Sequence, residues 1–177
     1  YGATGHTDLK GIGESIAGGH ADLRLAIVGM LLVLVGLLFK VSAVPFHMWT
    51  PDVYEGAITP VTAFMSVAVK AAAFGVLLRV LLGSFGDPLS ESQATGWPPV
   101  LAGLAALTMV YGNVAAVGQT NVKRLLAYSS IGHAGYMLMG VTVVASAATT
   151  ALRQEAATTS GEPLQTVLLL GFRYFVQ

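Results

Sequence analysis

Two lysines, Lys40 and Lys70, lie thirty residues apart in stretches that are otherwise apolar enough to cross a lipid bilayer. A lysine near the centre of a membrane helix costs roughly 2.5–3.5 kcal/mol on insertion scales, so it is not placed there for stability. Burial disfavours the charged ammonium and a nearby carboxylate favours it, which lets such a lysine release or capture a proton. The pair therefore predicts a proton path.

The depth of the two lysines follows from helix geometry. At a rise of about 1.5 Å per residue, Lys70 lies about 15 Å into its stretch, near the middle of a hydrocarbon layer of about 30 Å. Lys40 enters from the opposite face and lies about 22 Å deep by the same measure. The two ammonium groups are expected to share one buried polar layer. A second interpretation of Lys40 stays open, because its long side chain can reach the membrane interface.

Three further types of polar residue could extend the path. His47 follows Pro45, where an imidazole can relay protons or can simply bond to a carbonyl freed by a helix break. Tyr111, Asn113 and His133 are candidate lining residues of a hydrated path, although each is also an ordinary hydrogen-bonding or packing residue between membrane helices.

Other polar residues are weaker candidates. Tyr128, Ser129 and Ser130 would add polar lining beside the same stretch. Asp52 and Glu55 belong to a connecting turn and are expected to be solvated or capping groups. We expect no catalytic residue for substrate chemistry and no metal site, because the sequence has no nucleophile–base pair, phosphate-binding loop or metal-spaced cluster.

Composition assigns the class of protein. Hydrophobic residues make up 54% of the chain and charged residues 10%, which indicates an integral membrane protein. The formal net charge is zero and no long basic run occurs, so no nucleic-acid partner is expected. The absence of cysteine excludes thiolate-bound iron–sulfur clusters and covalently attached haem. His47 and His133 are too isolated to form the histidine pair of a b-type cytochrome.

The apolar stretches predict an all-α fold, a polytopic transmembrane helix bundle with one helix broken by proline. The region 23–147 is expected to hold four spans: 23–54 (broken at Pro45), 60–82, 98–118 and 125–147. The remaining segments are expected to be an inter-helix loop (1–22), a second loop (148–162) and the start of a truncated fifth span (163–177). Both ends therefore suggest a fragment of a longer chain.

Small residues recur inside the predicted spans. Gly29 and Gly36 lie in the first, Gly103 in the third, and Gly132 and Gly135 in the fourth. Small residues allow membrane helices to approach closely, so these positions predict a packed bundle.

Two runs carry a resemblance to a known family. KVSAVPFHMWTPDVYEGAITPVTAFMSVAVK (40–70) and QTNVKRLLAYSSIGHAGYML (119–138) are similar to the antiporter-like subunits of the membrane arm of respiratory complex I, and the likeness covers about residues 23–147. The resemblance implies a fourteen-helix subunit with two inverted five-helix repeats, each with one broken helix. By this likeness Lys40 pairs with a glutamate of an earlier helix, and Lys70 opens a central water-filled axis.

The resemblance also implies a function and partners. The chain would be part of a proton-translocating NADH:quinone oxidoreductase, a multi-pass protein of the bacterial plasma membrane, with no substrate chemistry of its own. Quinone reduction elsewhere would supply the free energy, and NADH, FMN, iron–sulfur clusters and quinone would bind in partner subunits. The expected partners are the other membrane-arm subunits and the lipid bilayer. Alternatives are a subunit of a Mrp-type cation/proton antiporter or of a membrane-bound hydrogenase, and a structural scaffold without transport.

Overall fold

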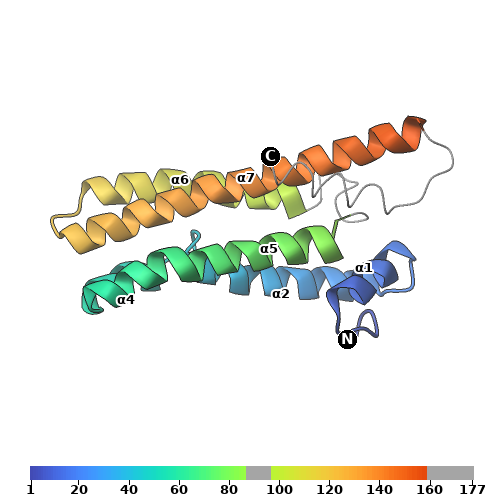
Figure 1. Ribbon diagram of the computed structural model, residues 1–177, viewed down its shortest axis with the longest axis horizontal. Coiled ribbons are helices and arrows are strands. Elements are labelled where there is room, and N and C mark those ends of the chain that lie inside the picture. Colours follow the sequence, from blue (N-terminus) through green and yellow to red (C-terminus); the bar gives the residue numbers. More distant parts are fainter. Residues whose placement is uncertain (87–96, 159–177) are drawn as a thin grey trace.

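The computed structural model describes residues 1–86 and 97–158, and its regular elements there are all helical, which confirms the predicted class (Figure 1). The elements are α1 (Leu9–Ala17), α2 (Leu23–Val41), α3 (Trp49–Gly56), α4 (Thr59–Phe64), the π-helical turn η1 (Met65–Val69), α5 (Lys70–Ser84), α6 (Trp97–Val117) and α7 (Val122–Thr158). Helices α2 and α5 pack together in one layer and α6 and α7 in another, and α1 packs against α5.

Four stretches among the described residues are long and apolar enough to cross a membrane. They are Leu23–Val41, Thr59–Ser84, Trp97–Val117 and Val122–Ala147. Helices α4 and α5 are continuous through η1, so the second stretch is one long helix. The chain is a multi-pass membrane protein.

The segment 1–22, expected to be a loop, contains helix α1. The Asp8 side chain accepts a hydrogen bond from the Gly11 N–H at 2.7 Å and so caps the helix. This bond lowers the pKa of the Asp8 carboxyl. Ile16 is buried against the end of the bundle, and the Ser84 hydroxyl donates to the Leu9 carbonyl at 3.0 Å. Tertiary packing therefore stabilises a helix that the glycine-rich sequence does not predict.

At the other end of the chain, α7 continues past its predicted boundary. The segment 148–162 was expected to be a loop, but the helix extends to Thr158. Alanine, leucine, arginine, glutamine and glutamate, which are good helix formers, recur in ATTALRQEAAT and allow the helix to continue. The predicted start of a fifth span at 163–177 lies outside the described residues.

The helix break lies slightly earlier than expected. Helix α2 ends at Val41, and Ser42 adopts a left-handed conformation with φ +66°. The Ser42 N–H still bonds to the Phe39 carbonyl at 3.2 Å, as in a common helix C-terminus. Pro45 follows inside the irregular segment, and the chain becomes helical again at Trp49. The break therefore starts at Ser42, and Pro45 is part of it.

Protein groups satisfy much of the backbone at this break, as a non-helical segment at membrane depth requires. The Val44 N–H donates to the Thr108 hydroxyl of α6 at 3.0 Å. The Thr50 hydroxyl donates to the Ser42 hydroxyl at 2.6 Å, which ties α3 to the end of α2. All four residues are buried. The break is thus held in one conformation against α6.

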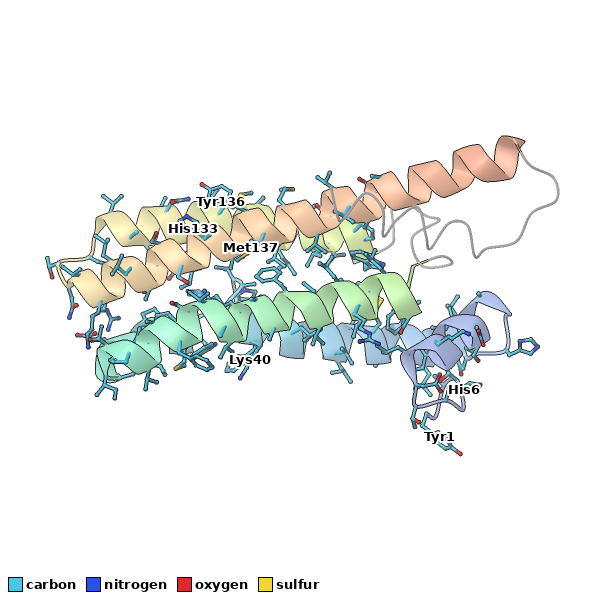
Figure 2. All side chains as sticks on the ribbon, in the orientation of Figure 1. Tyr1, His6, Lys40, His133, Tyr136 and Met137 are labelled. Carbon is cyan, nitrogen blue, oxygen red and sulfur yellow. The ribbon has the colours of Figure 1, made fainter. Side chains whose placement is uncertain are left out.

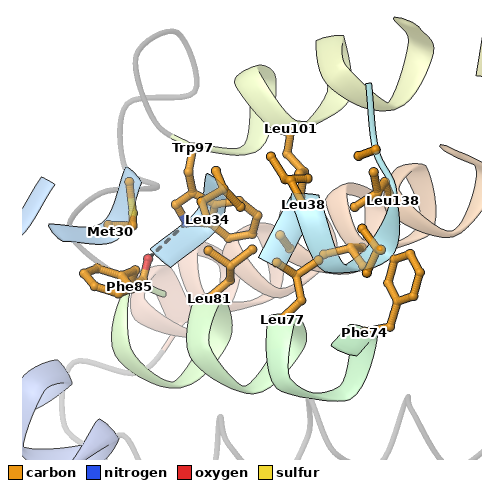
Figure 3. Packing of buried hydrophobic residues seen from close by; sticks show 14 of the residues in the cluster. Met30, Leu34, Leu38, Phe74, Leu77, Leu81, Phe85, Trp97, Leu101 and Leu138 are labelled. Carbon is orange, nitrogen blue, oxygen red and sulfur yellow. Dashed lines mark hydrogen bonds between the residues drawn. The ribbon is translucent and has the colours of Figure 1, made fainter. Parts of the chain in front are cut away.

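The two layers meet through a core of interlocking leucines (Figure 3). The buried leucines of this core are Leu34 and Leu38 of α2, Leu77 and Leu81 of α5, Leu101 of α6 and Leu138 of α7. The Trp97 indole N–H donates to the Phe85 carbonyl at 3.1 Å, the bond drawn in Figure 3. Lipid tails are as apolar as leucine, so these contacts stabilise the bundle mainly through close packing.

Glycines allow α6 and α7 to approach one another closely. A Cβ added at Gly112 would lie 2.6 Å from the Gly132 nitrogen, and a Cβ at Gly135 would lie 2.8 Å from the Met109 nitrogen. The predicted close packing at Gly132 and Gly135 is confirmed. For Gly29, Gly36 and Gly103 it is wrong within the described chain, because a Cβ there would meet nothing within 4 Å.

Candidate functional site

Lys70 lies buried between α5 and α7. Its side chain is 3% exposed, and its ammonium donates to the Ser130 hydroxyl at 2.6 Å and to the Ser130 carbonyl at 3.0 Å. In the part of the chain that the structure describes, no carboxylate forms an ion pair with it. The site is therefore a buried cation held by neutral oxygen atoms of one serine.

The backbone just before Lys70 is unusual. The π-helical turn η1 covers Met65–Val69, and Lys70 is the first residue of α5 after it. Single π turns inside α-helices are often found at functional sites. The sequence predicted an uninterrupted span over 60–82 and gave no signal of this turn.

Lys40 does not share this environment. It is exposed near the end of α2, and Figure 2 shows it on the side of the α2–α5 layer that faces away from α6 and α7. Among the described residues it has no ion pair. The burial expected for Lys40 is not seen within this chain, because no described helix covers that face of α2. Lys40 and Lys70 therefore do not meet in one buried layer here.

His47 lies in the break and is buried. Its ring packs edge-on against Tyr111 of α6, with 4.5 Å between the ring centroids. The His47 Nδ1 atom has no hydrogen-bond partner among the described groups. Tyr111 in turn lies 6.4 Å from the Tyr128 ring of α7. The structure thus places His47 beside Tyr111, one of the three predicted lining residues.

The other two lining candidates, Asn113 and His133, are exposed on α6 and α7, and Figure 2 shows His133 and Tyr136 on the side of α7 away from α5. The Asn113 amide donates to the Tyr136 hydroxyl at 3.3 Å and to the Met109 carbonyl at 2.8 Å. His133 Nδ1 lies 2.8 Å from the Ser129 carbonyl. Asn113 and His133 are exposed whereas Lys70 is buried, so the predicted residues fall into distinct clusters.

An ionic cluster joins α3 to the start of α7. The Arg124 guanidinium contacts Asp52 and Glu55, each at 2.8 Å, and the Asn121 amide donates to Glu55 at 2.7 Å. The Lys123 ammonium donates to the Glu55 and Ala57 carbonyls at 3.3 and 3.0 Å. Asp52 and Glu55 were expected to be solvated or capping groups. Their side chains are 72% and 38% exposed, so both reach solvent as expected, but both also pair with Arg124, which the sequence did not predict.

Replacing Arg124 with glutamine is expected to loosen this ionic cluster. Ion pairs that reach solvent stabilise a protein only weakly, so losing two should lower the thermal unfolding midpoint by a small amount. The loss should shrink at high salt because salt screens such charges. The thermal unfolding midpoint of the purified protein at low and high salt measures both effects. Arg24→Gln is the control, since the described structure gives Arg24 no ion pair; equal shifts for both variants would contradict the expectation.

Two features of the site could not be predicted from the sequence. Tyr54 is 2% exposed and lies on α3, which packs against α7. The ionic cluster likewise joins residues of α3 to α7. Only hydropathy and short motifs are visible in one sequence, and neither reports contacts over such separations.

These observations define a class: a polytopic helical membrane protein with a broken helix and a buried intramembrane lysine. The chain belongs to the NADH:quinone oxidoreductase/Mrp antiporter transmembrane family, whose family model matches residues 1–156. This agrees with the resemblance of the two sequence runs.

Within this family, the chain is similar in sequence to individual bacterial proteins. The chain is 65% identical over 145 residues to NADH-quinone oxidoreductase subunit N 1 of Sorangium cellulosum, covering 80% of this chain and 28% of that relative. It is 55% identical over 141 residues to NADH-quinone oxidoreductase subunit N of Mycobacterium tuberculosis strain H37Rv, covering 80% of this chain and 25% of the relative. The chain thus spans little more than a quarter of the length of these relatives.

A solved structure is also similar. The match is to a chain of respiratory complex I from Thermus thermophilus with bound aureothin, with 49% sequence identity and a TM-score of 0.57. It covers 68% of this chain and 25% of that one. The helices described above thus have a counterpart in a respiratory membrane complex.

Proposed function

We propose that this chain is part of subunit N of a bacterial NADH-quinone oxidoreductase, a proton-translocating complex, and that it carries protons through the plasma membrane. The single observation that carries the proposal is the buried Lys70 ammonium, which has only Ser130 oxygens as its hydrogen-bond partners among the described residues. The similarity to subunit N of several bacteria supports it.

The proposed mechanism uses the balance between two effects on Lys70. Burial disfavours the charged ammonium, and the two hydrogen bonds to Ser130 favour it. A small separation of α5 from α7 would remove the second effect, and the lysine would release its proton. Closing the gap would let it capture another. Quinone reduction in other subunits would drive this movement.

The remaining candidates take supporting roles in the proposal. His47 relays protons beside the break at Pro45, and Tyr111, Asn113 and His133 line a hydrated route. Lys40 is exposed on the side of α2 that faces away from α6 and α7, where a carboxylate of a neighbouring helix could pair with it. NADH, FMN, iron–sulfur clusters and quinone would bind in the partner subunits, and the other membrane-arm subunits would cover the exposed apolar surfaces.

Replacing Lys40 with arginine is expected to impair proton translocation. Arginine keeps the positive charge, but its guanidinium does not lose its proton in proteins. The measurement is proton uptake by membrane vesicles that contain the assembled complex, normalised to the rate of quinone reduction. Lys10→Arg is the matched control, because Lys10 lies on α1 outside the candidate spans. Normal uptake by the Lys40 variant would remove this lysine from the path.

The family also includes Mrp-type antiporters, which gives a second candidate function. The two are separated by measuring cation movement in vesicles that contain the full-length protein with its native partners. Transport that follows NADH oxidation and needs no sodium supports the oxidoreductase. Sodium-dependent proton exchange without NADH oxidation would select the antiporter.

A further inference from the structure

Thr108 of α6 is a fully buried polar residue to which the proposed path gives no role. Its hydroxyl donates to the Leu104 carbonyl at 2.6 Å, one turn earlier on the same helix, and accepts a hydrogen bond from the Val44 N–H at 3.0 Å. A hydroxyl has one proton and two lone pairs. The bond to Leu104 uses the proton, so the Thr108 oxygen acts toward the helix break only as an acceptor.

Thr142 of α7 shows how a buried threonine behaves without such a partner. Its hydroxyl donates to the Met139 carbonyl at 2.7 Å on its own helix. Within the described residues, it accepts no hydrogen bond from another element. Bonding back to the same helix is ordinary behaviour for threonine. Thr108 differs because it also holds a non-helical N–H that lies 64 positions away.

The bond to Val44 connects the helix break, residues 42–48, to the opposite layer. The other hydrogen bonds of the break that the structure describes connect it only to α2 and α3. At membrane depth, no bulk water is present to bond a free N–H group. Removing the Thr108 hydroxyl would therefore leave the Val44 N–H unpaired and would free the break from α6.

The same part of α6 also contacts the His47 ring. Tyr111 follows Thr108 by three positions, and residues three apart are neighbours on a helix surface. The His47 ring lies 4.5 Å from the Tyr111 ring, measured between centroids. The His47 Nδ1 atom has no hydrogen-bond partner among the described residues. The position of the imidazole therefore depends on the backbone that Thr108 holds and on the ring contact with Tyr111.

We propose that Thr108 is a positioning residue of the proton path: its hydroxyl holds the Val44 N–H so that the His47 imidazole stays against Tyr111. This rests on the proposed function, in which His47 relays protons beside the break. A proton-transfer group must lie within hydrogen-bond reach of its neighbours, about 2.6–3.2 Å. A misplacement of about 1 Å can lower a rate by about 100-fold. Thr108 itself carries no transferred proton, since its own proton bonds to Leu104.

The test is Thr108→Val in the full-length protein within the assembled complex. Valine matches the shape of threonine and lacks the hydroxyl, so proton uptake per quinone reduced should fall at least about tenfold. Thr108→Ser keeps the hydroxyl and should pump like the parent protein. Thr142→Val is the matched control, because it makes the same change at a buried threonine that holds no other described element. Parent-like uptake by Thr108→Val, or an equal loss in the serine variant or the control, would overturn the proposal.

A second measurement shows whether Thr108 acts through His47. His47→Gln should lower uptake at least as much as Thr108→Val, and the double variant should pump no less than His47→Gln alone. A merely structural role of Thr108 predicts independent losses that multiply, and that result would overturn the proposal. Parent-like uptake by His47→Gln would overturn it too.

Another variant serves if Thr108→Val fails to assemble. Tyr111→Leu removes the ring against which His47 is held and leaves the bond between Val44 and Thr108 in place. Its uptake should also fall at least about tenfold, for the same reason of misplacement. Parent-like uptake by this variant would show that the held position of His47 is not needed, and the proposal would be overturned.

Failure of this inference is separable from failure of the proposed function. If Lys70→Ala pumps fully, the proposed function is wrong, and the role of Thr108 is overturned with it. If Lys70→Ala is inactive while Thr108→Val pumps like the parent protein, only the positioning role of Thr108 is overturned.

Discussion

Proton translocation through this protein is expected to stop when Lys70 is replaced with alanine or leucine, while oxidation of NADH by the peripheral part of the complex continues. Neither side chain can carry a proton. The hydrogen bonds of Lys70 to Ser130 would be lost, but no carboxylate within the described residues would be left unpaired. The measurement is proton uptake by vesicles, with NADH oxidation by an artificial electron acceptor recorded separately.

Stability separates this role from a structural one. Inserting a lysine at membrane depth costs roughly 2.5–3.5 kcal/mol, and hydrogen bonds from a charged group return about 1.5–3 kcal/mol each. The two bonds together offset the insertion cost or somewhat exceed it, so Lys70→Leu should be at most modestly less stable than the parent protein and should still assemble. Lys10→Leu, on the exposed side of α1, serves as the control. A leucine variant that pumps normally would leave the chain as a scaffold.

The second large effect is expected from Gly112→Ala. The added methyl group would lie 2.6 Å from the Gly132 nitrogen and 2.9 Å from its Cα. These are backbone atoms, so the α6 and α7 helices must move apart. Overpacking of this kind costs about 1–3 kcal/mol, occasionally more. The thermal unfolding midpoint and the yield of assembled complex should both fall.

Gly103→Ala makes the same change on the same helix, at a position where a Cβ meets nothing within 4 Å. It should raise stability slightly, since alanine is favoured over glycine in a helix by about 1 kcal/mol. Equal midpoints for the two alanine variants would show that close contact at Gly112 does not hold the helices together. Loss of pumping in Gly112→Ala is also expected, because α7 carries Ser130.

The sequence predicted those features that depend on hydropathy and on proline. The spans predicted over 60–82, 98–118 and 125–147 agree with the structure to within a few residues, because lipid requires long apolar helices whatever they pack against. The first, predicted over 23–54 with a break, ends at Val41, and the chain becomes helical again only at Trp49. The burial of Lys70 was also predicted, since a charge in such a stretch is visible without coordinates; its place in a proton path stays a prediction. Residue size predicted the close contacts of α6 with Gly132 and Gly135, but the same argument failed at Gly29, Gly36 and Gly103, because size does not tell which face of a helix meets a neighbour.

The remaining features depend on contacts between distant parts of the chain. Arg124 meets Asp52 and Glu55 only because α3 packs on α7. Nothing in the local pattern marks these pairs. The exposure of Lys40 has a similar origin, because depth along a helix can be counted from sequence but the direction of a side chain around it depends on its neighbours.

The π turn before Lys70 alters the rotational phase of the long second span. One residue corresponds to about 100° around an α-helix, so a turn that holds one extra residue shifts the angular setting of everything after it. The side chains of α4 therefore point in directions that are rotated, around the helix axis, relative to those expected from continuing α5 backwards as a regular α-helix. A uniform helix could align only one of them with its neighbours. This single irregular turn lets Lys70 face Ser130 without rotating the first half of the span.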